Sequence, residues 1–269
     1  MAINALHSAS TGLSALNTEL DVTANNLANV NTVGFKGSRV NFQDLMYIEK
    51  AQPGVENANG DQRPTGLYVG LGVKVSGTQL DFTQGSPIAT GNQLDIAIDG
   101  IGFLQVSVEP DRATNGVAYT RAGALAVNRD GELVLANDQG RRIEPIITIP
   151  PDTIKIEISA NGEVFVSQPG APDLNQVGQL ELATFVNPAG LKQIGENLYS
   201  ETEGSGPPIV GNPGEENRGR VLQGFTEGSN VDPTRELINL IKTQRAFEMN
   251  SQTIRTADES LRAIAQLRR

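Results

Sequence analysis

The chain of 269 residues contains no cysteine and no tryptophan, and aromatic residues make up only 4% of it. The absence of cysteine excludes disulfide bonds, thiolate zinc sites and cysteine nucleophiles. Glycine (29) and proline (14) are abundant, and this composition favours short strands and turns over a bulky core. Length alone allows one large domain or two modest ones. We therefore expect a β-rich middle without deciding the number of domains.

Positive charge and long apolar runs are also scarce. The 21 Lys and Arg residues are outnumbered by 31 Asp and Glu, for a formal net charge of -10. A nucleic-acid-binding protein needs a basic patch that releases counterions from phosphates, so nucleic acid is not an expected partner. No Lys or Arg precedes Lys36, and no apolar run reaches the length of about 18 residues that a membrane span needs. The sequence predicts a soluble protein without a cleavable signal peptide or a membrane anchor.

Residues for catalysis and ligand binding are few. The only histidine, His7, lies in a weakly helical terminal segment, so we expect no catalytic triad and no metal site. No catalytic, cofactor-binding or metal-binding residue is assigned, and no cofactor is expected. Asp95 and Asp99 could in principle be the paired carboxylates of a glycosidase, but acids beside strands are usually solvated. The chain is therefore not expected to be an enzyme, and a glycosidase is the weaker alternative.

Both ends of the chain carry apolar residues at heptad spacing, which predicts one amphipathic helix at each end. The N-terminal stripe lies in a segment rich in Asn, Ser and Thr, so it should gain its order only when a partner covers it. Such stripes most often cover the core of their own domain, but that role does not require them at both extreme ends. The residues assigned to helix packing and assembly are Leu6, Leu13, Leu20, Leu27, Leu237, Leu240, Ile241, Phe247, Ile254 and Leu261.

The start of the C-terminal helix has clear signals. Asp232 is the expected N-cap, Pro233 occupies the first helical position, and Glu236 lies near the positive end of the helix dipole. Polar residues interrupt the apolar stripe of this helix, and isolated polar residues in coiled coils set the register at some cost in stability. We hypothesise this role for Thr243, Gln244, Asn250 and Ser251.

The middle of the chain has the alternation of strands. Residues 94–100 and 102–108 are expected to be strands, and a further strand is expected near residues 178–186. Two hairpins of one sheet domain are expected at residues 125–135 and 156–166, with turns at Asp130-Gly131 and Asn161-Gly162. Residues 52–66 and 200–220, rich in Gly and Pro, are expected to be irregular connections.

The run from Asn25 to Lys36 resembles the signature of bacterial flagellar rod and hook proteins. Residues 229–232, 236–237 and 244–251 are similar to the C-terminal helix of the same family. The signature residues are Asn25, Asn26, Leu27, Ala28, Asn29, Asn31, Gly34, Phe35 and Lys36.

Within this family, residues 42–47, 52–54, 66–73 and 195–199 are similar to the distal-rod branch. The first three stretches correspond to an additional segment that hook proteins lack, and we interpret them as a segment that braces neighbouring subunits. Its assigned residues are Phe42, Leu45, Tyr47, Pro53, Gly54, Gly66, Leu67, Gly70 and Gly72.

The resemblance implies an α+β fold, in which the N- and C-terminal helices pair as a coiled coil beside a central β-rich domain and an extended linking segment. The implied organisation along the chain is a core helix at 1–32, a linking and bracing segment at 33–73, a β-rich outer domain at 74–200, an irregular connection at 201–228 and a second core helix at 229–269.

The implied function is that of a structural subunit of the distal rod, polymerised into a rigid hollow helical shaft that transmits motor torque to the hook and lets export substrates pass. The implied partners are further copies of the chain, other rod and hook proteins, the surrounding P and L ring proteins and the flagellar type III export apparatus. The implied location is the basal body, across the periplasm, after export without cleavage. A proximal rod or hook subunit of the same family remains the first alternative, and a rod-associated peptidoglycan hydrolase is the second and weaker one.

Overall fold

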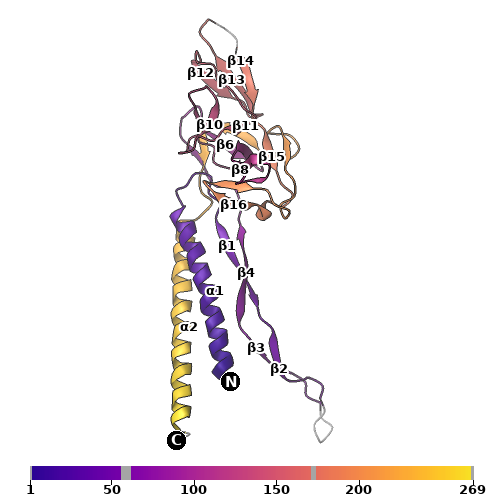
Figure 1. The fold of residues 1–269 in the computed structure, drawn as a ribbon, viewed down its shortest axis with the longest axis vertical. Helices are drawn as coiled ribbons and strands as arrows, with labels where there is room; N and C mark the ends of the chain where they lie inside the picture. Colours follow the sequence, from indigo (N-terminus) through magenta and orange to yellow (C-terminus); the bar gives the residue numbers. More distant parts are fainter. Residues whose placement is uncertain (1, 56–61, 171–173, 268–269) are drawn as a thin grey trace. The chain divides into compact units, whose positions relative to one another are not determined.

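The computed structural model describes residues 2–55, 62–170 and 174–267 of the chain (Figure 1). The chain divides into two compact units. The first, called the helical unit here, comprises residues 1–28, 38–80 and 232–269, and the second, called the β unit, comprises residues 29–37 and 81–231. The chain therefore passes between the two units four times, after residues 28, 37, 80 and 231.

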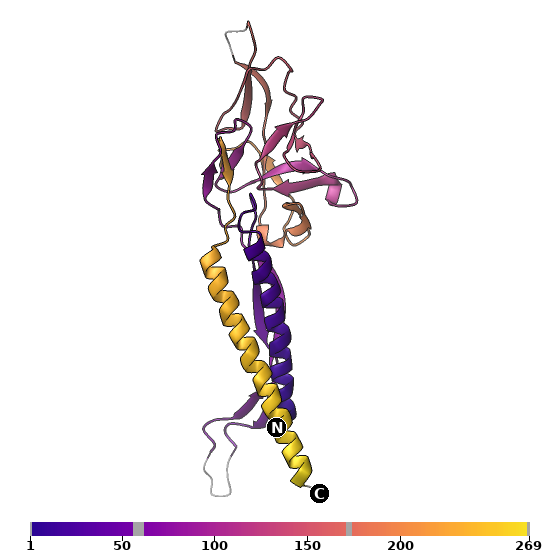
Figure 2. The same cartoon turned by 90° about the vertical axis from the view of Figure 1, so that its left-hand side faces the viewer.

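Two long helices dominate the helical unit. Helix α1 spans Ala2–Ala28 and helix α2 spans Pro233–Leu267, and the two run side by side in Figures 1 and 2. At about 1.5 Å per residue these helices are roughly 40 and 50 Å long. The α+β class and the contact between the terminal helices are thus confirmed.

The ends of the helices follow local signals. Helix α2 begins at Pro233, and the Asp232 carboxylate accepts hydrogen bonds from the backbone N–H of Thr234 at 2.9 Å and of Arg235 at 3.3 Å. The N-cap prediction is therefore confirmed. Helix α1 ends at Ala28, whereas the sequence placed the boundary of the first segment at residue 32. The residues that follow α1 belong to the β unit.

The helical unit also contains a β-ribbon. Strand β1 (Ser38–Asp44) pairs antiparallel with β4 (Val73–Leu80), with a bulge between Asn41 and Phe42, and β2 (Tyr47–Ala51) pairs with β3 (Leu67–Gly70). Both β1 and β4 lie against helix α1 (Figure 1). The expected bracing segment is thus a paired ribbon through residue 80, and residues 56–61 of that segment lie outside the described residues.

The β unit is built from short antiparallel strands. Its main sheet has the order β16-β17-β8-β7-β15-β18, and β11 also pairs with β7. The strands of this sheet are β7 (Phe103–Ser107), β8 (Val117–Thr120), β11 (Ile143–Glu144), β15 (Leu182–Thr184), β16 (Lys192–Gly195), β17 (Leu198–Ser200) and β18 (Ile209–Gly211). The smaller sheets are formed by β5 (Pro87–Ala89), β6 (Ile96–Asp99), β9 (Leu125–Val127), β10 (Leu133–Leu135), β12 (Lys155–Ile158), β13 (Glu163–Ser167), β14 (Asn175–Gln179), β19 (Arg220–Gln223) and β20 (Phe225–Glu227).

One apolar core holds these sheets together. Its residues come from alternate positions of the strands, as a half-buried sheet requires. Fully buried members are Ile96, Leu104, Val106, Val164, Leu180 and Leu182. Burial of each such side chain stabilises the unit by about 1.5–3 kcal/mol.

The hairpin predictions are confirmed in position. Strand β9 pairs with β10 across the Asp130-Gly131 turn, and β12 pairs with β13 across the Asn161-Gly162 turn. The two hairpins nevertheless lie in separate sheets of the β unit. The single strand expected near 178–186 is two strands, β14 and β15, because the chain changes sheet between them. Within the expected connection 201–228 the chain forms the short strands β18, β19 and β20.

Ion pairs join loops of the β unit. The Glu196 carboxylate lies 2.7 Å from Arg141 Nε and 2.6 Å from Arg112 Nη1, and Arg141 also pairs with Glu109. The hydrogen bond from Arg141, followed by that from Arg112, holds the pKa of Glu196 below its usual range against the opposing effect of burial.

This shift predicts an acid-dependent loss of stability. A carboxyl group with a lowered folded-state pKa stabilises the β unit above its unfolded-state pKa of about 4.3, and that stability is lost as the pH falls through the folded-state pKa. We expect Glu196→Gln to lower the free energy of unfolding by about 1 kcal/mol at pH 7, and by progressively less below about pH 4. Urea unfolding across this pH range measures the difference, with Glu203→Gln, an exposed acid of the same unit, as the control. A difference that does not vary with pH would contradict the role of the charge.

Candidate assembly surfaces

The facing sides of α1 and α2 are only partly covered by each other. Small residues of α1 are buried, among them Ala9 and Ala15, while the larger apolar residues of the stripes keep part of their surface exposed. Leu237 and Ile241 are 46% and 56% exposed. The half-buried members of the predicted stripes are Leu6, Leu13, Leu20, Leu27, Leu240, Phe247, Ile254 and Leu261. Two helices alone thus leave much of this apolar surface to be covered by something else.

Polar residues occupy part of the contact between the helices. Thr23 and Asn26 of α1 and Thr243 of α2 are buried, and the Thr243 hydroxyl donates to the Asn239 carbonyl at 2.9 Å. The Asn250 amide lies 3.0 Å from the position that a Cβ at Gly12 would occupy. Of the four residues for which a register role was hypothesised, Thr243 and Asn250 are thus placed within the helical contact, whereas Gln244 is exposed.

Asn26 of the signature links helix α1 to the ribbon. Its side-chain amide donates to the Ser38 carbonyl at 2.8 Å, and its side-chain carbonyl accepts from the Ser38 N–H at 3.0 Å. Asn26 also bonds to the side chain of Glu236. Burial raises the pKa of Glu236, and the bond to Asn26 partly opposes this rise. A single buried amide therefore bonds to the start of β1 and the first turn of α2.

The last three signature residues lie in the β unit and are buried. Gly34 has φ +70°, in the left-handed region that favours glycine, and its N–H donates to the Glu227 carbonyl at 2.8 Å. A Cβ at Gly34 would lie 2.6 Å from Ala122 N. Phe35 is 8% exposed and Lys36 is fully buried. The signature therefore contributes to both units of the protein.

The other signature residues occupy the surface near the end of α1. Leu27 and Asn29 are half-buried, and the Asn29 side-chain carbonyl accepts a hydrogen bond from the Thr32 hydroxyl at 3.1 Å. The exposed members are Asn25, Ala28 and Asn31.

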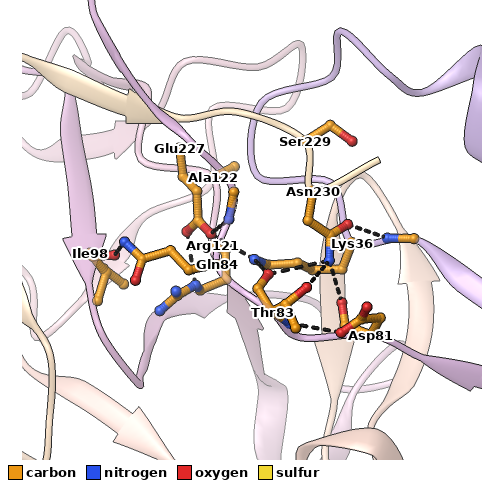
Figure 3. Close-up of polar contacts among 12 residues, drawn as sticks. Lys36, Asp81, Thr83, Gln84, Ile98, Arg121, Ala122, Glu227, Ser229 and Asn230 are labelled. Carbon is orange, nitrogen blue, oxygen red and sulfur yellow. Dashed lines mark hydrogen bonds and ion pairs between the residues drawn. The ribbon is translucent and has the colours of Figure 1, made fainter. Parts of the chain in front are cut away.

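The Lys36 ammonium is paired inside the β unit (Figure 3). Its Nζ lies 2.6 Å from Glu227 Oε1 and donates to the Thr83 carbonyl at 2.7 Å, and the other Glu227 oxygen lies 2.9 Å from Arg121 Nε. Burial lowers the pKa of Lys36, and the bond to Glu227 opposes that shift. One carboxylate thus pairs with two buried cations. Such a buried cluster is stable only while the carboxylate stays within hydrogen-bonding distance of both cations.

The sequence did not predict the partners of Lys36. Arg121 follows strand β8 and Glu227 ends β20, and neither belongs to a periodic pattern. Glu227 and Lys36 are 191 residues apart in the chain. The only available signal for Glu227 was its place directly before the C-terminal family stretch 229–232.

The ribbon exposes large apolar side chains. Met46 is 80% exposed, Tyr47 57%, Leu67 55% and Tyr68 51%. Of these four, Tyr47 and Leu67 were predicted bracing residues. The exposed ones among the remaining predicted residues are Phe42, Pro53 and Gly54, and the half-buried ones are Leu45, Gly66, Gly70 and Gly72. An exposed apolar surface of this kind on a two-stranded ribbon indicates a docking partner.

The ribbon packs closely on helix α1 at Gly72, between strands β3 and β4. This glycine has φ +116°, and a Cβ there would overlap the Thr11 hydroxyl and lie 3.1 Å from Ser8 Cα. We expect Gly72→Val to displace the ribbon from α1 at a cost of about 1–3 kcal/mol, with a loss of rod stiffness. The control is Gly77→Val in the adjoining strand β4, since nothing lies within 4 Å of a Cβ at that position. Rod stiffness and swimming under load measure the effect, and equal stiffness of the two variants would show that this packing is dispensable.

Side chains that could ligate a metal ion are not clustered in the described part of the chain. Among residues 2–55, 62–170 and 174–267, no three His, Cys, Asp or Glu side chains are placed to hold a metal ion. Asp95 accepts a hydrogen bond from Asn92 at 3.1 Å, and Asp99 accepts one from Gln84 at 3.3 Å. No helix of the described part is long and apolar enough to cross a membrane.

Three family models match successive parts of the chain. The model described as flagella basal body rod protein matches residues 6–36, the D1 domain of flagellar hook protein FlgE/F/G matches 97–166, and the C-terminal domain of flagellar basal body rod FlgEFG protein matches 222–267. The first match covers α1 and the signature, and the last covers β20 and α2.

Whole-length relatives agree with the family models. The flagellar basal-body rod protein FlgG of Agrobacterium fabrum is 46% identical to the chain, with 96% of each protein covered. FlgG of Caulobacter vibrioides is 43% identical, covering 99% of this chain and all of the relative, and FlgG of Bacillus subtilis is 36% identical over the same shares. The chain therefore belongs to the family of flagellar basal-body rod proteins and is a structural subunit of the rod.

Proposed function

We propose that copies of this chain polymerise into the distal rod, a rigid hollow helical shaft that transmits motor torque to the hook and lets export substrates pass. The observation that supports this proposal is the apolar surface left open on the paired terminal helices and on the ribbon. In a head-to-tail polymer these surfaces contact neighbouring copies, and such contacts produce a filament because they do not close on themselves.

The role of the ribbon in this proposal is to brace adjacent subunits. Its exposed side chains, led by Met46 and Tyr47, are placed on a paired ribbon and not on a loose loop. Pairing fixes the backbone before contact, so less conformational entropy is lost when a neighbour binds. Many such contacts in each subunit give a shaft its stiffness.

The partners of the shaft are other rod and hook proteins, the P and L ring proteins around it and the flagellar type III export apparatus. The chain reaches the basal body, across the periplasm, by export without cleavage. Its action is mechanical and not enzymatic. The residues assigned above to helix packing and bracing are the ones that we propose to carry the assembly contacts.

Amide hydrogen exchange on the monomer and on the assembled rod tests the proposal. Half-covered helices with poor intrinsic propensity should exchange freely in the monomer and become protected in the polymer, while core strands such as β7 stay protected in both. We expect protection of α1 and α2 amides to rise by at least about 100-fold on assembly, because the helices then open only with the whole polymer. Firm protection of both helices in the dilute monomer would overturn the proposal.

The two alternatives have separate tests. A proximal rod or hook subunit would assemble normally without an ordered contact between the ribbon and a neighbouring copy. A peptidoglycan hydrolase would release wall fragments, with an activity that Asp95→Asn or Asp99→Asn abolishes.

A further inference from the structure

Three segments of the β unit adjoin three of the four points where the chain passes between the β unit and the helical unit. They are residues 33–37, residues 81–85 and residues 227–231, which are far apart in the sequence. All three lie together in the β unit and are joined by polar contacts (Figure 3). The chain therefore enters and leaves the β unit through segments that contact one another.

Asn230 bonds to both of the other segments. Its side-chain carbonyl accepts the Gly37 N–H at 2.8 Å, and its side-chain N–H₂ donates to the carbonyls of Asp81 at 2.8 Å and Thr83 at 3.2 Å. The Asp81 N–H in turn donates to the Gly37 carbonyl at 2.8 Å. One amide side chain thus closes a ring of hydrogen bonds among the three segments.

Lys36 and Glu227 make a second connection among the same segments. Lys36 Nζ donates to Glu227 at 2.6 Å and to the Thr83 carbonyl at 2.7 Å. Glu227 Oε1 also accepts the Gly85 N–H at 2.9 Å. Lys36 is completely buried and Glu227 is 1% exposed. Each of the two charges therefore bonds to residues 83–85 as well as to the other.

A polar connection of this kind allows less relative movement of the connected segments than an apolar one does. Apolar side chains can slide past one another at little cost, whereas a buried charge or amide that leaves its partners pays for desolvation without compensation. The buried contacts of Lys36 and Glu227 and the contacts of the half-buried Asn230 amide are all made together in this arrangement of the three segments. Such contacts fix geometry more than they add net stability.

We propose that Lys36, Glu227 and Asn230 are positioning residues that form a junction clamp, which fixes the segments adjoining β1, β4 and α2 in one arrangement at the β unit. This inference rests on the proposed load-bearing function. These segments adjoin three of the four covalent connections between the helical unit and the β unit, so they carry load that passes along the chain between the two units. A clamp makes the three segments bear that load together.

The variant Asn230→Ala tests the clamp, and Asn128→Ala is its matched control. Asn128 lies in the β9–β10 turn of the same unit and makes a comparable set of bonds, accepting from Asp130 N at 2.9 Å and Glu132 N at 2.8 Å and donating to Glu132. Both variants remove one buried or half-buried amide from the β unit. Only Asn230→Ala removes it from the connecting segments. Lys36→Met is the second clamp variant, because Glu227 remains paired with Arg121.

Amide exchange of the full-length monomer gives the first measurement. In Asn230→Ala we expect exchange at Gly37 and Asp81 to accelerate at least about 10-fold while the core amide of Leu104 is unchanged, since the clamp opens locally. Asn128→Ala should leave Gly37 and Asp81 unchanged. Equal acceleration at Leu104, or no acceleration at Gly37 in either clamp variant, would overturn the proposal.

Rod stiffness and swimming in viscous medium give the second measurement. Both clamp variants should assemble rods that bend more and fail to drive swimming under load, whereas Asn128→Ala rods should behave as the parent does. If the clamp opens but rod stiffness and swimming persist, the clamp has no positioning role, and the proposal that the chain polymerises into a rod is unaffected. The proposal of polymerisation is tested independently, by comparing amide exchange in the monomer and in the rod.

Discussion

Replacing Glu227 by glutamine is expected to lower the free energy of unfolding of the β unit by about 3–5 kcal/mol, the cost of breaking a buried ion pair from one side. Glutamine keeps the shape and one acceptor oxygen, but it leaves the Lys36 and Arg121 cations without their shared carboxylate. Lys36 can lose its proton because burial already lowers its pKa. Arg121 remains charged, since guanidinium does not deprotonate in proteins.

Substitution of Lys36 should lower the free energy of unfolding less than substitution of Glu227 does. Lys36→Met leaves the Glu227–Arg121 pair neutral, so its loss of stability should be the smaller. The double variant Lys36→Met/Glu227→Gln should be more stable than Glu227→Gln alone, because one uncompensated charge is gone. Lys36→Met as damaging as Glu227→Gln would show that charge balance does not hold the cluster together.

Urea unfolding of the monomer measures these differences. The buried side chains of Tyr119 and Tyr199, 3% and 2% exposed, report unfolding of the β unit through their fluorescence, and the chain has no tryptophan to mask them. The loss in Glu227→Gln should shrink as the pH rises toward the unperturbed lysine pKa of about 10.4. A lysine with a lowered folded-state pKa binds fewer protons folded than unfolded, so stability rises with pH in this range.

Local features were predictable because their causes lie within a few residues. The heptad stripes indicated α1 and α2, Asp232 and Pro233 marked the start of α2, and the Asp130-Gly131 turn marked a hairpin. Each signal acts through backbone geometry or side-chain periodicity that neighbouring residues determine.

Features that join distant segments left no comparable signal. Strand β1 pairs with β4, which follows it only after β2 and β3, so no local signal marks the pairing. Strands of three residues such as β18 and β20 are too short to show an alternating pattern. The charge on Glu227 has a meaning only beside Lys36 and Arg121, and nothing in the sequence places them together. Family resemblance marked Asn26 and Lys36, but only the structure shows what they bond to.

The family resemblance nevertheless located residues that periodicity could not. Gly34 is part of the signature, although no sequence pattern explains a glycine at this position. In the structure its φ is positive, and a Cβ there would collide with the backbone of Ala122. The signature thus combines a helix end, a helix-to-ribbon bond and a buried charge. These three roles would not be expected from a single twelve-residue run read as a helix alone.

Removing the ribbon is expected to change the mechanics of the shaft more than its assembly. Deletion of residues 39–73 should give rods that still form, because the terminal helices remain, but that bend as a hook does. A cleaner variant joins Asp44 to Val73 through Asn-Gly in place of residues 45–72, since those two residues already pair and an Asn-Gly turn closes such a hairpin.

Substitutions within the ribbon distinguish the loss of its exposed apolar side chains from the loss of the whole segment. Tyr47→Ser with Leu67→Ser removes two exposed apolar contacts while β2 and β3 stay paired, and Lys50→Ser in β2 is the control. Two apolar anchors buried against a neighbour are worth about 1.5–3 kcal/mol each, repeated in every subunit. We expect the persistence length of purified rods, measured by electron microscopy, to fall several-fold in the deletion and the Tyr47/Leu67 variant, because stiffness sums these repeated contacts. Rods of the deletion variant as straight and stiff as the parent would refute the bracing role, since the terminal helices alone would then carry the stiffness.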